Sequence, residues 1–186
     1  MLRCSVMSTD ITPSAVVAFW KEAGPAKWFA KNDAFDAEFR RRFHDAHVAA
    51  ARRELDDWME TPEGALALLI LLDQFPRNSF RGTAHAFATD PLALMFAEDA
   101  VERGHHEAFD FPLRNFMLLP FEHSERLEDQ DRYMALAAGD AESLKWGRIH
   151  RDIIVRFGRF PHRNPELGRK TTPEEQAFLD EGGFGG

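Results

Sequence analysis

The sequence predicts an all-helical protein. At four helix starts, a residue type that caps helices is followed by proline, which suits the first helical position. These dipeptides are Thr12-Pro13, Thr61-Pro62, Asp90-Pro91 and Thr172-Pro173. Glu175 completes a capping box at the last of them. Apolar residues recur at intervals of three and four, and no segment alternates with the period of two that is typical of strands. We therefore expect about eight or nine helices and no sheet.

The apolar pattern defines the longer helices in order. A stripe of aromatic and small residues predicts a helix from about Asp33 to Trp58. Further stripes lie at Leu92–Ala100 and at Ile149–Phe160. The run from Ala65 to Leu72 is apolar on every side, as in a central helix that has neighbours all round. We expect this run to be inaccessible to solvent.

Length and composition predict one domain without a membrane span. The 186 residues are enough for a single core, which we place at residues 13–186 after a flexible N-terminus, residues 1–12. The longest apolar run has eight residues, far fewer than a bilayer requires. Cys4 is the only cysteine, and the N-terminus lacks the apolar stretch of a signal peptide. These features favour a cytoplasmic protein.

The charge is acidic overall but unevenly distributed. A formal net charge of −8 disfavours a general nucleic-acid binder. The segment from Lys145 to Lys170, however, holds eight Lys or Arg residues and only two acids. This segment is either a solvated face that neighbouring acids neutralise, or a source of arginines for an anion site.

A short polar motif occurs twice. Phe75-Pro76-Arg77-Asn78 is followed by Arg81-Gly82, and Phe160-Pro161-His162-Arg163-Asn164 by Leu167-Gly168-Arg169. Each copy follows an apolar helical run, which we expect its proline to end. The two turns should lie close together, because polar groups at the edge of a core must be paired. Candidate ligand-binding residues are Gln74, Arg77, Asn78, Arg81, His150, Arg159, His162, Arg163 and Asn164.

Three residues are candidates for acid–base chemistry. Asp73 ends the most apolar helix, where a carboxylate is costly unless it is paired. It either forms an ion pair with Arg77 or Arg163, or orients a base beside them. His123 is the best single candidate for a general acid or base, and we expect it within reach of both turns. Glu125 is the third candidate, and no recognised metal-ligand spacing is present.

Several longer motifs together resemble a known bacterial family. They include Leu72-Asp73-Gln74-Phe75-Pro76-Arg77-Asn78, His123-Ser124-Glu125, Phe157-Gly158-Arg159-Phe160-Pro161-His162-Arg163-Asn164 and Thr172-Pro173-Glu174-Glu175. Over about residues 15–186 the chain is similar to the bacterial domain-of-unknown-function family 924. The resemblance implies antiparallel helix pairs similar to tetratricopeptide repeats, in an alpha-alpha superhelix, and it implies no activity. Glu122 departs from the family pattern, which usually has methionine there.

The sequence supports two functions of different classes, and a third hypothesis treats both Arg-Asn motifs as structural clamps, with the function on an unmarked surface. In the first, the protein binds a small carboxylate or phosphate metabolite in a pocket lined by Arg, Asn and His, with or without catalysis by hydrolysis or isomerisation. In the second, it is a tetratricopeptide-like scaffold that binds a peptide or protein in its helical groove. No cofactor or native metal is expected, and the sequence does not indicate an oligomeric state.

Overall fold

The computed structural model describes residues 11–28 and 30–185, and these residues form helices and turns without any strand. The all-helical prediction is confirmed for this part of the chain. The α-helices are α1 (Pro13–Ala23), α2 (Pro25–Trp28), α3 (Asp33–Ala51), α4 (Pro62–Leu69), α5 (Phe75–Ser79), α6 (Asp90–Glu102), α7 (Asn115–His123), α8 (Leu127–Leu136), α9 (Ala141–Phe157) and α10 (Pro173–Asp180). Short 3-10 helices occupy Asp56–Glu60, Ala84–Phe87, His105–Ala108 and Pro161–Arg163, and a π turn occupies Ile70–Gln74. The tetratricopeptide-like superhelix stays a prediction.

The expected flexible N-terminus, residues 1–12, falls mostly outside the described residues, as does Cys4. Three of the four predicted Pro-containing starts are confirmed, because the hydroxyls of Thr12, Thr61 and Thr172 accept hydrogen bonds from backbone N–H groups of their helices. The cap predicted at Asp90 is wrong. Thr89 occupies the cap position there and makes no side-chain cap bond. The Asp90 carboxylate does not cap the helix but binds Arg77 and Arg163.

The helix predicted from Asp33 to Trp58 is shorter than expected. It ends at Ala51, and Arg53 adopts a left-handed backbone conformation with φ of 63°. The apolar stripe stops at Ala50, so the polar residues that follow offer no buried face that would hold a further helical turn on the core.

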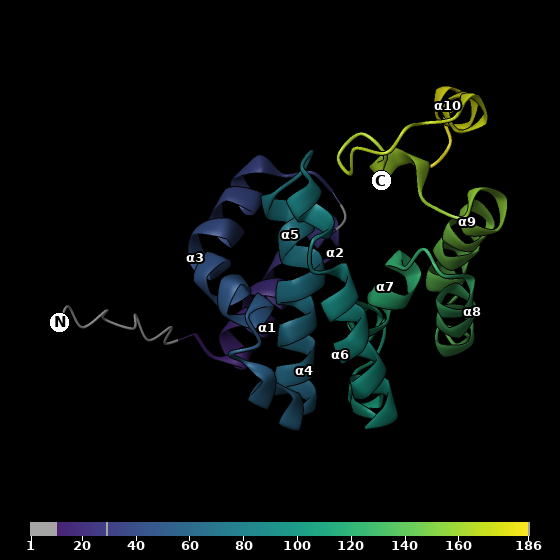
Figure 1. The fold of residues 1–186 in the computed structure, drawn as a ribbon. Coiled ribbons are helices and arrows are strands. Elements are labelled where there is room, and N and C mark those ends of the chain that lie inside the picture. The colour runs from purple at the N-terminus through teal and green to yellow at the C-terminus, as the bar shows by residue number, and fades with distance from the viewer. Residues whose placement is uncertain (1–10, 29, 186) are drawn as a thin grey trace.

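The central position of Ala65–Leu72 is confirmed, since each of these residues is 0 % exposed. Figure 1 shows α4 continuing into α5 in the middle of the molecule, with α1 and α3 on one side and α6 on the other. The helices α7, α8 and α9 follow in sequence, each packed against the next. Among the described helices, none is both long enough and apolar enough to cross a membrane.

The prediction that Pro76 ends the central helix is wrong. The helix widens into the π turn, in which the Phe75 N–H donates to the Ile70 carbonyl five residues back, and then continues through Pro76 to Ser79. A proline inside a helix lacks the N–H that would bind the carbonyl four residues earlier, here that of Leu72. The π turn lets the chain pass the proline without ending the helix.

Three carbonyls of this turn are bound by side chains, two of which come from other segments of the chain. His47 Nδ1 of α3 lies 2.9 Å from the Leu71 carbonyl, and the Thr89 hydroxyl donates to the Leu72 carbonyl. Arg77 Nη1 donates to the Asp73 carbonyl at 2.9 Å. Because buried carbonyls need donors, these bonds fix the turn against α3 and the start of α6.

The C-terminal helices also approach each other closely. A Cβ atom on Gly147 of α9 would lie 2.6 Å from the Tyr133 ring of α8, so only glycine fits at this contact. His150 follows one turn later on α9. Phe184 of the glycine-rich tail packs back on the His150 ring, with 4.5 Å between ring centroids.

Replacing Leu69 by alanine should lower the free energy of unfolding by about 2–5 kcal/mol, because it removes buried methyl groups and leaves a cavity. Urea unfolding measures this loss. Val155→Ala is the control, since Val155 is 57 % exposed and its truncation should cost less than about 0.5 kcal/mol. Equal effects of the two changes would mean that α4 is not the centre of the core.

Thr89→Val should destabilise the protein by about 1–3 kcal/mol, because the Leu72 carbonyl would stay buried without a donor. The matched control is Thr83→Val, whose hydroxyl donates to the carbonyl of Phe80 at an exposed site and should matter little. Urea unfolding of both variants tests the role of Thr89. A Thr89 variant as stable as the wild type would contradict it.

Candidate functional site

The π turn of the central helix carries a buried carboxylate that binds three side chains. Asp73 is fully buried, and its Oδ1 lies 2.6 Å from His123 Nδ1 and 3.1 Å from Arg77 Nη1. Gln74 Nε2 donates to the other oxygen at 2.6 Å. Burial alone would raise the pKa of Asp73, but the positive charge of Arg77 and the contact with His123 outweigh it, so the pKa lies well below its usual value. Asp73 is therefore ionised.

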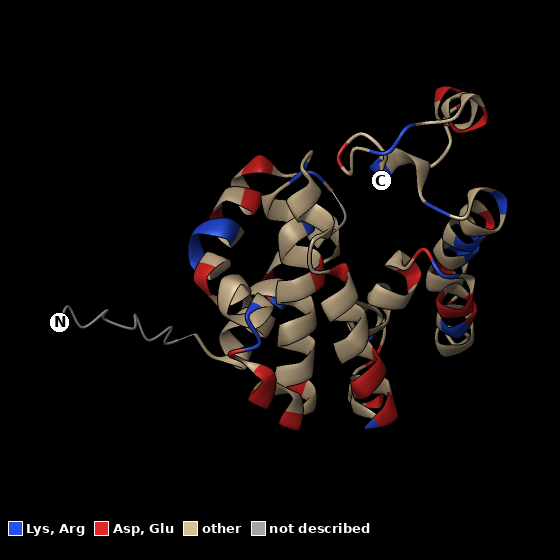
Figure 2. Ribbon diagram, in the orientation of Figure 1, with Lys and Arg blue, Asp and Glu red and all other residues tan. Residues whose placement is uncertain are grey.

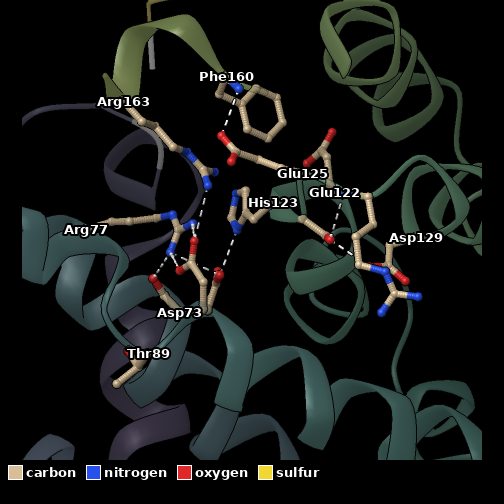
Figure 3. A network of polar contacts seen from close by, with 12 residues as sticks. Asp73, Arg77, Thr89, Glu122, His123, Glu125, Asp129, Phe160 and Arg163 are labelled. Atoms are coloured by element: carbon tan, nitrogen blue, oxygen red, sulfur yellow. Dashed lines mark hydrogen bonds and ion pairs between the residues drawn. The ribbon is translucent and has the colours of Figure 1, made fainter. Parts of the chain in front are cut away.

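Asp90 brings the two copies of the polar motif together. Arg77 binds both Asp90 oxygens, at 2.8 and 3.0 Å, and Arg163 Nη1 reaches Oδ2 at 3.3 Å. The prediction that the two arginine turns lie close together in space is thus confirmed. In Figure 3, Asp73 and Arg77 of the central helix, His123 of α7 and Arg163 of the C-terminal segment point toward one another.

Arg163 is the least satisfied charged group of this cluster. It is 6 % exposed, and its guanidinium lies over the rings of Phe87 and Phe160, at 4.8 and 4.5 Å from their centroids. Its buried Nε has no hydrogen-bond partner, and no described residue binds Nη2. Burial and the nearby charge of Arg77 lower the pKa of Arg163 to about 10. An additional anion would therefore stabilise this cation.

His123 has the arrangement of a general base. A carboxylate only accepts hydrogen bonds, so the Nδ1 facing Asp73 carries the proton and Nε2 keeps its lone pair. Burial and Arg77 lower the pKa of His123 more than Asp73 raises it, so the ring is neutral near pH 7. The side chain is 14 % exposed, which leaves the site a narrow access to solvent.

A second group of histidines continues the site toward the C-terminal tail. His150 Nδ1 donates to the Trp146 carbonyl at 3.0 Å, and its ring centroid lies 6.5 Å from that of His123. His162 Nδ1 is buried without a partner, and the Phe184 ring lies 5.3 Å away. Burial is the largest cause that lowers both pKa values, that of His150 to about 4 and that of His162 to about 3.

Four further candidate residues bind carboxylates outside the Asp73 cluster: Asn78, Arg81, Arg159 and Asn164. Asn78 and Arg81 bind the two oxygens of Asp36, at 2.7 and 3.0 Å. Asn164 and Arg159 both bind Glu175, the N3 residue of the α10 capping box. The Asn of each copy thus shares a carboxylate from another helix with a nearby Arg, which is Arg81 in the first copy and, for the second, Arg159 directly before the motif.

Glu125 also lies in structural contacts. Its carboxylate binds Arg169 in a bidentate ion pair, at 2.7 and 3.0 Å, and accepts the Phe160 N–H at 2.8 Å. These contacts fasten the second copy of the motif to the end of α7. They occupy both oxygens of the carboxylate, so we assign Glu125 no acid–base role.

The basic segment from Lys145 to Lys170 is largely neutralised. Figure 2 shows Lys and Arg along α9 and in the loop that follows it. Ion pairs connect these arginines to acids of other elements: Arg151–Asp131, Arg156–Glu174, Arg159–Glu175, Arg163–Asp90 and Arg169–Glu125. Most of these arginines pair near the surface, as the first alternative expects, while Arg163 enters the buried cluster; the anion site stays a prediction.

A pocket of about 430 Å³ lies beyond the opposite end of α4, and its lining includes Arg53, Asp56, Phe96 and Arg103. It shares no residue with the polar cluster. In the described ranges, no group of three or more His, Cys, Asp or Glu residues is arranged to hold a metal ion. We place the candidate site at the Asp73–His123–Arg163 cluster because its buried polar groups converge there.

Two contributors to this cluster were missed from the sequence. From the sequence, Asp90 was interpreted only as a helix cap. The role of Phe87 in covering Arg163 had no sequence signal, because a stacking contact across 76 residues depends on tertiary structure.

Comparison with known proteins identifies relatives but no activity. Residues 16–183 match the family model described as "Bacterial protein of unknown function (DUF924)". The structure of a protein of unknown function from Agrobacterium tumefaciens is similar, with 56% sequence identity and a TM-score of 0.89. The match covers 91% of this chain and 97% of that one. No curated protein matches this chain.

Acid should destabilise the protein in part through His150. Its pKa falls from 6.5 to about 4 on folding, so between these values the unfolded state binds more protons and stability decreases as the pH falls. His150→Asn keeps a donor for the Trp146 carbonyl but removes the titration. The slope of unfolding free energy against pH should decrease by up to about 1.4 kcal/mol per unit. Urea unfolding at several pH values measures it, with His44→Asn as surface control. An unchanged slope in the His150 variant would contradict the assignment.

Proposed function

Because the chain belongs to this bacterial family of unknown function, DUF924, we propose a function from the site itself: the protein binds a small oxyanion, the carboxylate or phosphate group of a metabolite, at Arg163. The unpartnered Nε of this buried guanidinium is the observation that carries the proposal. A buried donor without a partner costs about 1–3 kcal/mol, and more when it is charged. An oxyanion would supply the missing acceptor.

The geometry of Arg163 selects the kind of ligand. Phe87 and Phe160 lie against the guanidinium group, and Nη1 is used by Asp90. What stays available is the edge formed by Nε and Nη2, whose two parallel N–H groups match the two oxygens of a carboxylate or phosphate. Arg77, in contrast, is occupied by Asp73 and Asp90, so its role is to hold Asp90 in place.

The neighbouring His123–Asp73 pair supports acid–base chemistry on the bound molecule. Asp73 fixes the tautomer of His123, which leaves Nε2 as the proton acceptor. Gln74 holds Asp73 from the other side. A ligand bound by its anionic end at Arg163 would have a neighbouring atom or water activated by His123, as in hydrolysis or isomerisation. No observation in the described residues favours the alternative of a peptide-binding scaffold.

Arg163→Lys should abolish or strongly weaken anion binding, because an ammonium group cannot form the two parallel bonds of the guanidinium edge. Titration calorimetry at pH 7 with acetate, oxalate and inorganic phosphate measures this effect. Thermal shift detects the same binding, since a ligand at about 100 times its dissociation constant adds about 2.7 kcal/mol of stability.

The matched control is Arg156→Lys. Arg156 lies on the neighbouring helix α9, is 49 % exposed and pairs with Glu174. This variant should bind like the wild type. Failure of the wild type to bind any of the three anions, or equal binding by the Arg163 variant, would overturn the proposal.

A further inference from the structure

Glu122 is a buried acid that the proposed chemistry does not use. It lies next to His123 at the end of α7, and its side chain is 4 % exposed. Its buried Oε1 has no hydrogen-bond partner. His150 Nδ1 lies 3.4 Å from this oxygen but already donates to the Trp146 carbonyl. An ionised carboxylate in such surroundings is costly, so the carboxyl keeps its proton.

The groups around Glu122 do not offer a compensating charge. Asp73 faces it from the π turn and is ionised, so it repels a second negative charge. His150 of α9 and His123 of its own helix are neutral near pH 7, because both pKa values are lowered. Tyr133 of α8 also faces it, and burial and Glu122 raise the pKa of that phenol. Burial and Asp73 together raise the pKa of Glu122 to about 8.

His150 connects Glu122 to the proposed anion site. Its ring touches Glu122 on one side and lies 5.5 Å from the Phe160 ring on another. Phe160 is the ring over which the Arg163 guanidinium lies, at 4.5 Å. The charge of Glu122 would therefore act across two side chains, those of His150 and Phe160, in a buried region where electrostatic interactions are weakly screened.

We infer that Glu122 is a positioning residue of the same site, and that the oxyanion at Arg163 binds tightly only while Glu122 carries its proton. This inference rests on the proposed function. A neutral Glu122 leaves Asp73 and Asp90 as the acids that balance Arg77 and Arg163. An ionised Glu122 adds a third negative charge, which opposes a bound anion. Binding is thereby linked to one proton.

The linkage predicts a specific pH profile. In wild type, the dissociation constant of oxalate should rise roughly tenfold between pH 7 and pH 9, as a required proton with a pKa near 8 is lost. Oxalate suits the test because its own charge is constant over this range. In Glu122→Gln, which cannot ionise, the constant should change less than about twofold, because Arg163 stays charged. Glu128→Gln, an exposed change on α8, should follow the wild-type profile.

The outcomes separate the two proposals. If oxalate binds with the same pH profile in wild type and Glu122→Gln, the role of Glu122 is refuted and the anion site stands. If wild type binds none of oxalate, acetate and inorganic phosphate at pH 7, both proposals fail. Infrared spectroscopy gives a readout without ligand: a protonated carboxyl C=O band at pH 7 should vanish at pH 10 and be missing from Glu122→Gln. A band that the substitution leaves unchanged would refute the inference.

Discussion

Pro76 imposes the constraint on which the rest of the structure depends. It lies in the middle of the buried central helix and has no N–H to donate, so carbonyl groups of the preceding turn need donors from elsewhere. His47 and Thr89 supply them. Since His47 belongs to α3 and Thr89 precedes α6, the same bonds that complete the helix also dock it against both neighbours. Arg77, which binds the carbonyl of Asp73, is then already in place to hold Asp90.

The polar cluster depends on this docking of the central helix against α3 and α6. Once Thr89 is fixed, the next residue, Asp90, lies between Arg77 and Arg163 and joins the N-terminal helices to the C-terminal segment. Asn78 and Arg81 of the first copy bind Asp36, and Asn164 of the second copy binds Glu175 together with the preceding Arg159. The repeated motif is thus mostly a fastening device, and the difference between its copies is that Arg77 is saturated while Arg163 retains an unpartnered edge.

The parts of this arrangement that follow from local physics could be predicted from the sequence. Threonine caps, the apolar run Ala65–Leu72 and the pairing of Asp73 depend on neighbours in the chain or on burial alone. The π turn could not be predicted, because proline usually ends a helix and only the distant donors of His47 and Thr89 make continuation favourable. Asp90 was misassigned for the same reason, since a carboxylate before proline is a good cap until two arginines approach it from elsewhere.

The π turn also makes the spacing of residues in the central helix a part of the site. Each residue of an α-helix turns the chain by about 100°, so a helix with one residue fewer between Ile70 and Gln74 would present every later side chain in a different direction. Arg77 would leave Asp90, and Asn78 would leave Asp36. Substitutions in this stretch should therefore be tolerated better than insertions or deletions of a residue. Changes of length are better accommodated in the loops. The length of this buried turn is fixed because Arg77 and Asn78 must reach Asp90 of α6 and Asp36 of α3.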